Sequence, residues 1–230
     1  MKDKNFQGVK QMKKFFYCLK NNGLFKTFKS AYLYFFYDYI FDFIHKTETF
    51  EKELIDNSYL SNGDISGITR YSPCSRYKLI KLIKLLPLKT KNNIFLDLGS
   101  GKGLAAFTAS NFFFKVIGVE IIKKLYDDSL INLKKMKYNN IEFYYDDATK
   151  FNISKEINVI FLSNPCFRNM MLKIIQNILK SYNENKRDLY IIYYSLNYTC
   201  IDIMSENFEI INKVYFNSKI IPEAIIYKAK

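Results

Sequence analysis

Residues 95–103 read Phe-Leu-Asp-Leu-Gly-Ser-Gly-Lys-Gly, an apolar run that passes directly into a loop with glycine at every second position. Residues 94–98 have the apolar character of a buried strand, and residues 102–111 have that of a helix. Glycines at such a junction let the backbone turn sharply and approach a ligand closely, while the free amides of the following helix can bind it. The stretch therefore predicts a strand, a ligand-binding loop and a helix.

Two details of this loop restrict its ligand. A dinucleotide-binding loop has the spacing Gly-x-Gly-x-x-Gly, but the third glycine here is Gly103, and Leu104 stands where that spacing requires glycine. Asp97 lies two residues before the first glycine, where a carboxylate would repel a pyrophosphate and attract a cation. The loop therefore disfavours a nicotinamide oxidoreductase and favours a ligand that carries positive charge.

Short apolar runs alternate with amphipathic stretches along the rest of the chain. We expect further strands at residues 116–120, 141–145, 159–162 and 189–194, and helices at residues 122–136 and 171–182. Strands that alternate with helices specify a parallel sheet covered on both faces. Residues 208–216 and 223–228 are strand-like with only a turn between them, which predicts an antiparallel hairpin at the sheet edge. The fold class is therefore α/β, with a doubly wound, mostly parallel sheet of seven strands.

The N-terminal region has a different composition. Residues 1–30 carry eight Lys and one Asp, and an aromatic-rich stretch follows at residues 31–44. That stretch has 14 residues and two Asp, which is shorter than the roughly 20 residues that cross a bilayer. We interpret residues 1–60 as a basic helical extension packed on the main domain, with a membrane-surface segment or a substrate lid as alternatives. Residues 61–72 are expected to form a loop, and residues 73–230 the main domain.

The composition of the whole chain indicates which classes of protein it can belong to. Its 230 residues are 49% hydrophobic and 25% charged, which is typical of a globular protein. The net charge of +13 favours an anionic partner, but only four of the 35 basic residues are Arg, the side chain that phosphate and guanine recognition favours. Four dispersed cysteines and one histidine, His45, predict neither a disulfide framework nor a metal site. We expect a cytoplasmic location, with a membrane-proximal one as the alternative.

The glycine loop closely resembles motif I of the class I, seven-strand S-adenosylmethionine-dependent methyltransferases, which commonly reads Asp-Leu-Gly-Ser-Gly-x-Gly. Residues 116–120, Val-Ile-Gly-Val-Glu, are similar to that family's second strand, whose final acidic residue binds both ribose hydroxyls. Residues 145–149, Tyr-Asp-Asp-Ala-Thr, are similar to the family's Gly-Asp-Ala-Thr, with Asp146 in place of glycine. The resemblance implies a Rossmann-like fold with S-adenosylmethionine as cofactor, Glu120 on the ribose and Asp147 on the adenine amino group.

A segment before the loop resembles a smaller group of these enzymes. Residues 70–77, Arg-Tyr-Ser-Pro-Cys-Ser-Arg-Tyr, are similar to the Tyr-x-Pro segment of small bacterial methyltransferases and of seven-strand lysine methyltransferases. Because that segment covers the cofactor in those enzymes, we expect its two tyrosines to do so, with helix packing as the alternative. The resemblance as a whole implies these cofactor-binding residues: Tyr71, Tyr77, Asp97, Gly99, Ser100, Gly101, Gly103, Glu120, Asp147, Ala148, Asn164 and Pro165.

Residues 164–167, Asn-Pro-Cys-Phe, bear on the methyl acceptor. They loosely resemble the Asn-Pro-Pro-aromatic motif of amino-group methyltransferases, in which the Asn accepts hydrogen bonds from the acceptor amine. The resemblance makes Asn164 the catalytic candidate and a protein side-chain nitrogen, such as that of lysine, the leading acceptor. A nucleic acid, a small molecule or a lipid are alternative acceptors, and a catalytically silent cofactor-binding scaffold is the alternative from another class.

Overall fold

The computed structural model describes residues 28, 32–33, 35–50, 53–54, 70–163, 168–194, 200–216 and 220–230. Residues 61–69 of the expected loop lie outside the described residues, and so do Asn164 and Pro165. The division of the chain at residue 60 stays a prediction.

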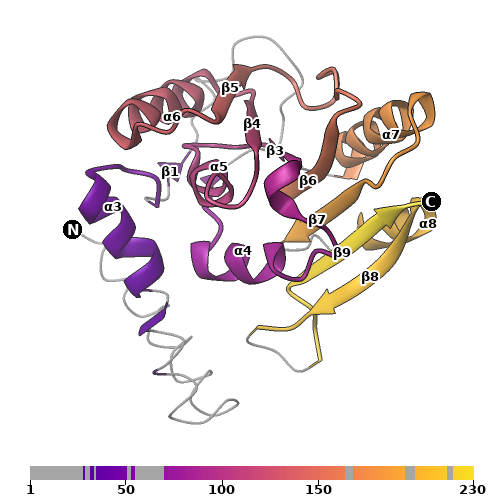
Figure 1. The fold of residues 1–230 in the computed structure, drawn as a ribbon, viewed down its shortest axis with the longest axis horizontal. Coiled ribbons are helices and arrows are strands. Elements are labelled where there is room, and N and C mark those ends of the chain that lie inside the picture. Colours follow the sequence, from indigo (N-terminus) through magenta and orange to yellow (C-terminus); the bar gives the residue numbers. More distant parts are fainter. Residues whose placement is uncertain are drawn as a thin grey trace.

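A seven-stranded sheet forms the centre of the molecule (Figure 1). Its spatial order is β5-β4-β3-β6-β7-β9-β8, with the first five strands parallel and β9 antiparallel to both of its neighbours. The strands are β3 (Ile94–Leu98), β4 (Lys115–Glu120), β5 (Ile141–Tyr145), β6 (Ile157–Ser163), β7 (Tyr190–Tyr194), β8 (Phe208–Val214) and β9 (Ala224–Ala229). This confirms the predicted α/β fold, including the antiparallel pair at the edge.

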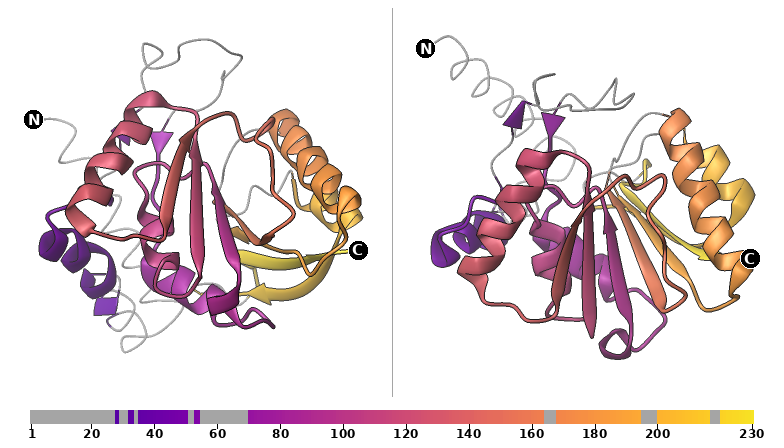
Figure 2. Two further views of the ribbon diagram at one scale, coloured as in Figure 1. Left: turned by 45° about the horizontal axis from the view of Figure 1, so that its top comes forward. Right: turned by 90° about the horizontal axis from the view of Figure 1, so that it is seen from above.

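Helices cover both faces of this sheet (Figure 2). One face carries α4, α5 and α6, and the other carries α7 and α8. Their bounds are α4 (Arg76–Ile83), α5 (Leu104–Ala109), α6 (Lys123–Met136), α7 (Arg168–Glu184) and α8 (Ile201–Asn207), and a short 3-10 helix, η3, spans Thr90–Asn92. The sequence did not predict α8, because seven residues are too few to establish a helical period.

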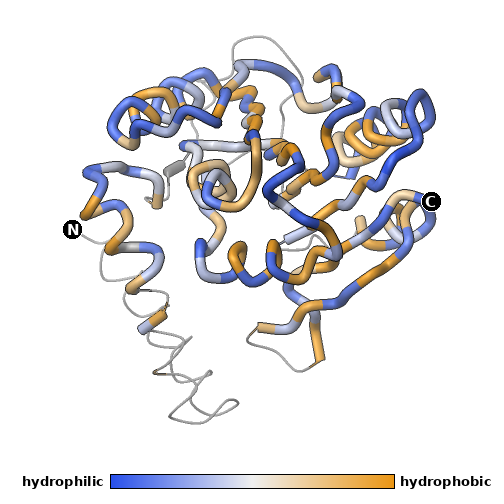
Figure 3. Tube along the Cα trace, viewed as in Figure 1, coloured by the Kyte–Doolittle hydropathy of each residue, from blue (hydrophilic) through white to orange (hydrophobic). Residues whose placement is uncertain are grey.

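The apolar runs follow from this two-sided covering. Phe95 of β3 packs into the core beneath α4 and α5, while Leu96 and Leu98 pack into the core beneath α7. A strand buried on both faces must be apolar at successive positions, which is why residues 94–98 read as a continuous run. Helices α6 and α7 are buried on one face, and hydrophilic and hydrophobic residues alternate along them (Figure 3). All six residues of α5, by contrast, are buried.

The aromatic stretch near the N-terminus is helical. A π-helical turn, η1 (Phe35–Tyr39), continues into α3 (Ile40–His45). Its aromatic residues are divided between the buried and the exposed sides of the helix, since Phe36 and Phe43 are 48% and 84% exposed while Phe41 is buried. Further along, β1 (Glu53–Leu54) pairs with β2 (Arg70–Tyr71) in a small antiparallel sheet. None of the helices in the described part of the chain is both long enough and apolar enough to cross a membrane.

Candidate functional site

The glycine loop lies where β3 ends, at the carboxyl edge of the parallel strands. The amides of Gly99 and Ser100 both donate to the carbonyl oxygen of Val119 on β4, at 2.9 and 3.0 Å. The loop is thereby fixed to the neighbouring strand. Its glycines, Gly99, Gly101 and Gly103, all have positive φ, at 84°, 54° and 92°. The alternating glycines therefore match the turns that the backbone makes.

Glu120, the last residue of β4, is buried beneath this loop. Its Oε2 atom accepts a hydrogen bond from the amide of Gly101, and its Oε1 atom accepts one from the amide of Ile122, each at 2.8 Å. A carboxylate has about four lone-pair positions, so two remain for further donors such as hydroxyl groups. The side chain predicted to bind ribose is therefore held rigidly against the glycine loop.

Asp97 shares this buried space. Its side chain is 2% exposed, and its Oδ2 atom has no hydrogen-bond partner within the described structure, nor has the hydroxyl of Ser100. Burial, and then the charge of Glu120, raise the pKa of Asp97 to about 8. Burial also raises the pKa of Glu120, against the lowering effect of the backbone amides. Two buried carboxyl groups on adjacent strands suit a cationic ligand with hydroxyl and amine donors, so they fit S-adenosylmethionine and would repel a pyrophosphate.

The ring of Tyr71 lies over the glycine loop. A Cβ atom added to Gly101 would come within 2.2 Å of Tyr71 Cε2, so the two residues are in close contact. The Tyr71 hydroxyl donates to the carbonyl oxygen of Thr49 at 2.8 Å. The other tyrosine of this segment, Tyr77, lies on α4 and packs against Tyr37, with ring centroids 5.6 Å apart. The structure thus brings Tyr71 onto the loop and Tyr77 against the N-terminal helix.

The turn after β5 lies beside Glu120, whose carbonyl oxygen accepts the amide of Asp146 at 3.1 Å. The carboxylate of Asp146 accepts the amide of Asp147 at 2.7 Å, and that of Asp147 accepts the amide of Thr149 at 2.8 Å. Ala148 packs against the core beneath α7. The predicted adenine-binding residues therefore sit in a defined turn next to the predicted ribose-binding residue.

The replacement of glycine by Asp146 does not strain this turn. Within the described residues, the non-glycine positions with positive φ are Lys46 and Lys137. Asp146 therefore has an ordinary backbone conformation, and the turn does not need glycine there.

The proposed acceptor residues follow β6. Asn164 and Pro165 lie outside the described residues, but β6 ends at Ser163, and its Leu162 pairs with Leu98 of β3. Strand β6 therefore ends at the same edge of the sheet as the glycine loop.

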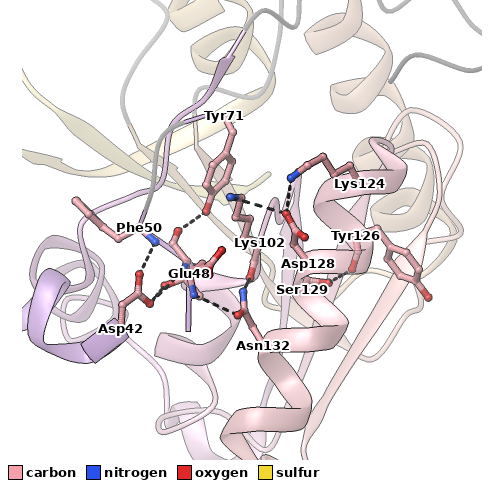
Figure 4. Close-up of polar contacts among 11 residues, drawn as sticks. Asp42, Glu48, Phe50, Tyr71, Lys102, Lys124, Tyr126, Asp128, Ser129 and Asn132 are labelled. Carbon is pink, nitrogen blue, oxygen red and sulfur yellow. Dashed lines mark hydrogen bonds and ion pairs between the residues drawn. The ribbon is translucent and has the colours of Figure 1, made fainter. Parts of the chain in front are cut away.

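Further residues of the site were not predicted from the sequence (Figure 4). Asp42 accepts hydrogen bonds from Thr47, Thr49 and Phe50, and Asn132 of α6 bonds to the glycine loop. One signal in the sequence could have drawn attention to Asn132. It is a polar residue that lies on the same buried face of α6 as Leu125. The bonds of Asp42 reach residues five to eight positions along the chain, which is further than the two to four residues that side-chain-bonded turns span.

Comparisons with known proteins identify the family. The family model described as a methyltransferase domain matches residues 89–228. The fold resembles that of the N-methyltransferase NodS from Bradyrhizobium japonicum, with a TM-score of 0.54 and 11% identity over 67% of this chain and 95% of that one. It also resembles a putative methyltransferase from Streptococcus mutans solved in complex with SAH, with a TM-score of 0.51 and 14% identity over 67% of this chain and 96% of that one.

A curated protein also matches part of the sequence. An uncharacterized protein of Methanocaldococcus jannaschii is 28% identical over 92 residues, which are 39% of this chain and 36% of that protein. The matched part of the chain thus spans just over a third of the length of this curated relative. The family match, which covers more than half of the chain, agrees with the fold and with the cation-favouring loop. The chain therefore belongs to the methyltransferase domain family, and its cofactor is S-adenosylmethionine.

Proposed function

We propose that the chain transfers the methyl group of S-adenosylmethionine to a nitrogen atom of a protein side chain, such as that of lysine. When bound, the cofactor supplies a methyl group on a positively charged sulfur atom that leaves readily. The protein then has to place the nitrogen in line with the methyl group and allow one proton to leave. Such a reaction requires hydrogen-bond acceptors beside the cofactor more than it requires a nucleophilic side chain.

The place where strand β6 ends supports this acceptor class. Strand β6 is parallel to β3 and hydrogen-bonded to it, and Phe161 pairs with Asp97. Ligands of open α/β sheets bind at the carboxyl ends of the strands, and β6, which the Asn-Pro-Cys-Phe segment follows in the sequence, ends at that edge. An Asn at this place can accept hydrogen bonds from an amine and direct its lone pair. This placement is the observation that carries the proposal.

The fold accommodates acceptors of this kind. One similar structure is named an N-methyltransferase, and another is named ribosomal protein L11 methylase, from Lactobacillus delbrueckii. The latter has a TM-score of 0.54 and 16% identity over 70% of this chain and 80% of that one. Those names describe those proteins, and at these identities they support only the capacity of the fold.

A labelling experiment tests the acceptor class. The protein is incubated with S-adenosylmethionine carrying a radioactive methyl group and with a cell extract, which is then divided into protein, nucleic-acid and lipid fractions. We expect protease-sensitive, nuclease-resistant label that acid hydrolysis releases as N-methylated lysine. Asn164→Ala should retain affinity for S-adenosylhomocysteine and lose transfer, whereas Glu120→Ala should lose both. Label that nuclease removes, or that extracts with lipid, would contradict a protein acceptor.

The scarcity of arginine weighs against a nucleic-acid acceptor. Phosphate contacts would make transfer fall steeply as salt rises, so a salt titration separates the two acceptors. We expect transfer to the protein fraction to depend weakly on salt. A fall of about a thousandfold between 50 and 200 mM salt would instead indicate several phosphate contacts.

A membrane-proximal acceptor is a second candidate function. Exposed aromatic rings lie at Tyr32, Phe36 and Phe43, and residues 1–30 of the sequence carry a net charge of +7. Lysines beside exposed aromatic rings are typical of segments that lie on anionic bilayers. Co-sedimentation with vesicles of anionic and of zwitterionic lipid tests this. Binding to anionic vesicles that Phe36→Ala/Phe43→Ala weakens would support it, and equal recovery with both lipids would contradict it.

A further inference from the structure

Residues 47–50, which follow α3, form a short segment that we call the strap. Asp42 of α3 holds its shape: Oδ1 accepts the hydroxyls of Thr47 and Thr49, each at 2.6 Å, and the amide of Thr49 at 3.1 Å. The other oxygen, Oδ2, accepts the amide of Phe50 at 2.8 Å. Thr47, Thr49 and Phe50 are all buried. The strap is therefore an ordered part of the core around the site.

The strap holds the tyrosine that covers the glycine loop. The carbonyl oxygen of Thr49 accepts the hydroxyl of Tyr71, and the ring of Tyr71 lies directly over Gly101. The ammonium group of Lys102 lies 5.7 Å from the centre of the same ring. The position of Tyr71 over the loop therefore depends on where the strap lies.

One side chain joins the strap to the glycine loop from the other side (Figure 4). Asn132 of α6 accepts the amide of Glu48 on its Oδ1 atom at 3.3 Å, and its Nδ2 atom donates to the carbonyl oxygen of Lys102 at 3.2 Å. Asn132 is 3% exposed although it lies in the middle of a helix that also faces solvent. Its single amide group thus bonds to both segments at once.

These contacts form a closed ring of interactions around the glycine loop. Tyr71 bonds to Thr49 of the strap, and Glu48 of the strap bonds to Asn132. Asn132 in turn bonds to Lys102, which follows Gly101, the residue that Tyr71 covers. We propose that Asn132 is a positioning residue for cofactor binding, because it holds the strap and the glycine loop together and so keeps Tyr71 over the loop. Binding of the cofactor and ordering of the strap are then thermodynamically linked, so each strengthens the other.

The chemistry of the amide explains why this position takes Asn. The Glu48 amide can only donate and the Lys102 carbonyl can only accept, so the bridging group needs an acceptor and a donor. Asn132→Asp keeps the acceptor for Glu48 but places a carboxylate oxygen against the Lys102 carbonyl. Asn132→Ala removes both bonds. The two variants therefore separate the bond to the glycine loop from the bond to the strap.

The chain offers a matched control in Asn140. Its Nδ2 atom donates to the carbonyl oxygens of Ser110 and Phe113, at 3.0 and 3.2 Å. It also joins two segments through one side-chain amide, but it precedes β5 and therefore lies at the amino edge of the strands, away from the glycine loop. Asn140→Ala should lower stability without changing affinity for the cofactor.

The experiment measures binding of S-adenosylhomocysteine by calorimetry to the full-length wild type and to each variant. We expect Asn132→Ala and Asn132→Asp to weaken binding about tenfold or more, which corresponds to the loss of one or two buried hydrogen bonds, and Asn140→Ala to stay within twofold. Hydrogen exchange supplies a second readout. S-adenosylhomocysteine should slow exchange of the Thr49 and Phe50 amides in the wild type and in Asn140→Ala, and should no longer do so in Asn132→Ala.

Each outcome bears on the inference. If Asn132→Ala does not fold, Asp42→Asn perturbs the strap without touching α6 and should weaken binding in the same way. Wild-type affinity in Asn132→Asp and Asp42→Asn, or undiminished protection of the strap, would overturn the positioning role. The inference rests on cofactor binding and not on the acceptor class. Failure of the wild type to bind S-adenosylhomocysteine would overturn the cofactor site itself, whereas loss of transfer with normal binding would concern only the acceptor.

Discussion

Tyr71 occupies the space that any side chain at position 101 would need. A Cβ atom on Gly101 would lie 2.2 Å from Tyr71 Cε2 and 2.8 Å from Cδ2, which is far inside normal contact distance. The ring cannot move aside freely, because its hydroxyl is bonded to the carbonyl oxygen of Thr49. The glycine is thus required by a contact with a distant segment as well as by its own positive φ of 54°.

Gly101→Ala should therefore be strongly destabilising. A left-handed conformation costs a non-glycine residue about 1–2 kcal/mol, and displacing the Tyr71 ring should cost about 1–3 kcal/mol more. The free energy of unfolding, measured in urea, should fall by about 2–5 kcal/mol, and binding of S-adenosylhomocysteine should be lost.

Gly99→Ala separates the two causes. Gly99 also has positive φ, at 84°, but a Cβ atom there would have no neighbour within 4 Å. The free energy of unfolding of this variant should therefore fall only by the backbone cost, about 1–2 kcal/mol. Equal destabilisation by the two substitutions would contradict the contact with Tyr71.

Much of the fold follows from local pattern. Strands 94–98 and 141–145 were predicted at the residues where they occur. The first is buried along nearly all of its length, which requires an apolar run, and the second places Ile141 and Phe143 in the core with exposed residues between and after them. Helix α8 was not predicted, since its seven residues are held in place by packing of Ile203 and Met204 on the core and not by a period of their own.

The candidate site divides in a similar way. Asp97 and Glu120 could be predicted because each lies within the last two residues of a strand that leads into a motif, and the structure buries them together. The bonds of Asp42 and Asn132 were not predicted. Those of Asp42 go to residues five to eight positions further along the chain. Those of Asn132 go to backbone atoms of Lys102 and Glu48, 30 and 84 residues away, and no local spacing encodes such a partner. The residues of the site whose role depends on tertiary contacts are thus the ones that sequence patterns do not reveal.

The buried carboxyl of Asp97 should make the stability of the cofactor-free protein depend on pH. In the unfolded chain it titrates near its usual value of about 4, and in the folded chain its pKa is about 8. Between these values the native state holds a proton that the unfolded state has released. Stability should therefore fall as the pH rises from about 4 to about 8 and level off above that. Urea unfolding of wild type and Asp97→Asn tests this, since the variant should lose that part of the slope.

Cofactor affinity should show the opposite trend. A cationic ligand favours the ionised form of Asp97, so below about pH 8 binding must release a proton. The affinity for S-adenosylmethionine should therefore rise between about pH 6 and pH 8, by up to about tenfold per unit. The ligand's own ionisation affects its binding to the wild type and to Asp97→Asn equally. The ratio of the two affinities at each pH therefore reports the ionisation of Asp97 alone. A ratio that does not change with pH would count against contact between this carboxyl and the cofactor's charge.

Asp147 and Asp146 can be distinguished through the adenine amino group. Asp147 is the more buried of the two, and both brace the same turn. If Asp147 reads the amino group, the wild type should bind S-adenosylhomocysteine about 10 to 100 times more tightly than the inosine analogue, which lacks it. Asp147→Ala should remove this preference, and Asp146→Ala should keep it. The reverse result would assign adenine recognition to Asp146.

Asp38 links the N-terminal helix to the main domain, and its removal should be costly. Its Oδ1 atom accepts the amide of Arg76 at 2.7 Å, at the first residue of α4, where Ser75 makes no capping bond of its own. Asp38→Ala would lose this cap and the compensating charge beside the half-buried Arg76, so the free energy of unfolding in urea should fall by about 2 kcal/mol.

An exposed ion pair provides the comparison for Asp38. Asp202 bonds to Arg168 at 2.8 Å, but both side chains are largely exposed, so Asp202→Ala should lower the free energy of unfolding far less than Asp38→Ala does. Burial raises the pKa of Asp38 to about 6, so this group should also lower stability as the pH rises from about 4 to 6, and Asp38→Asn should not show that loss. Equal effects of Asp38→Ala and Asp202→Ala would mean that the N-terminal helix contributes little to the stability of the domain.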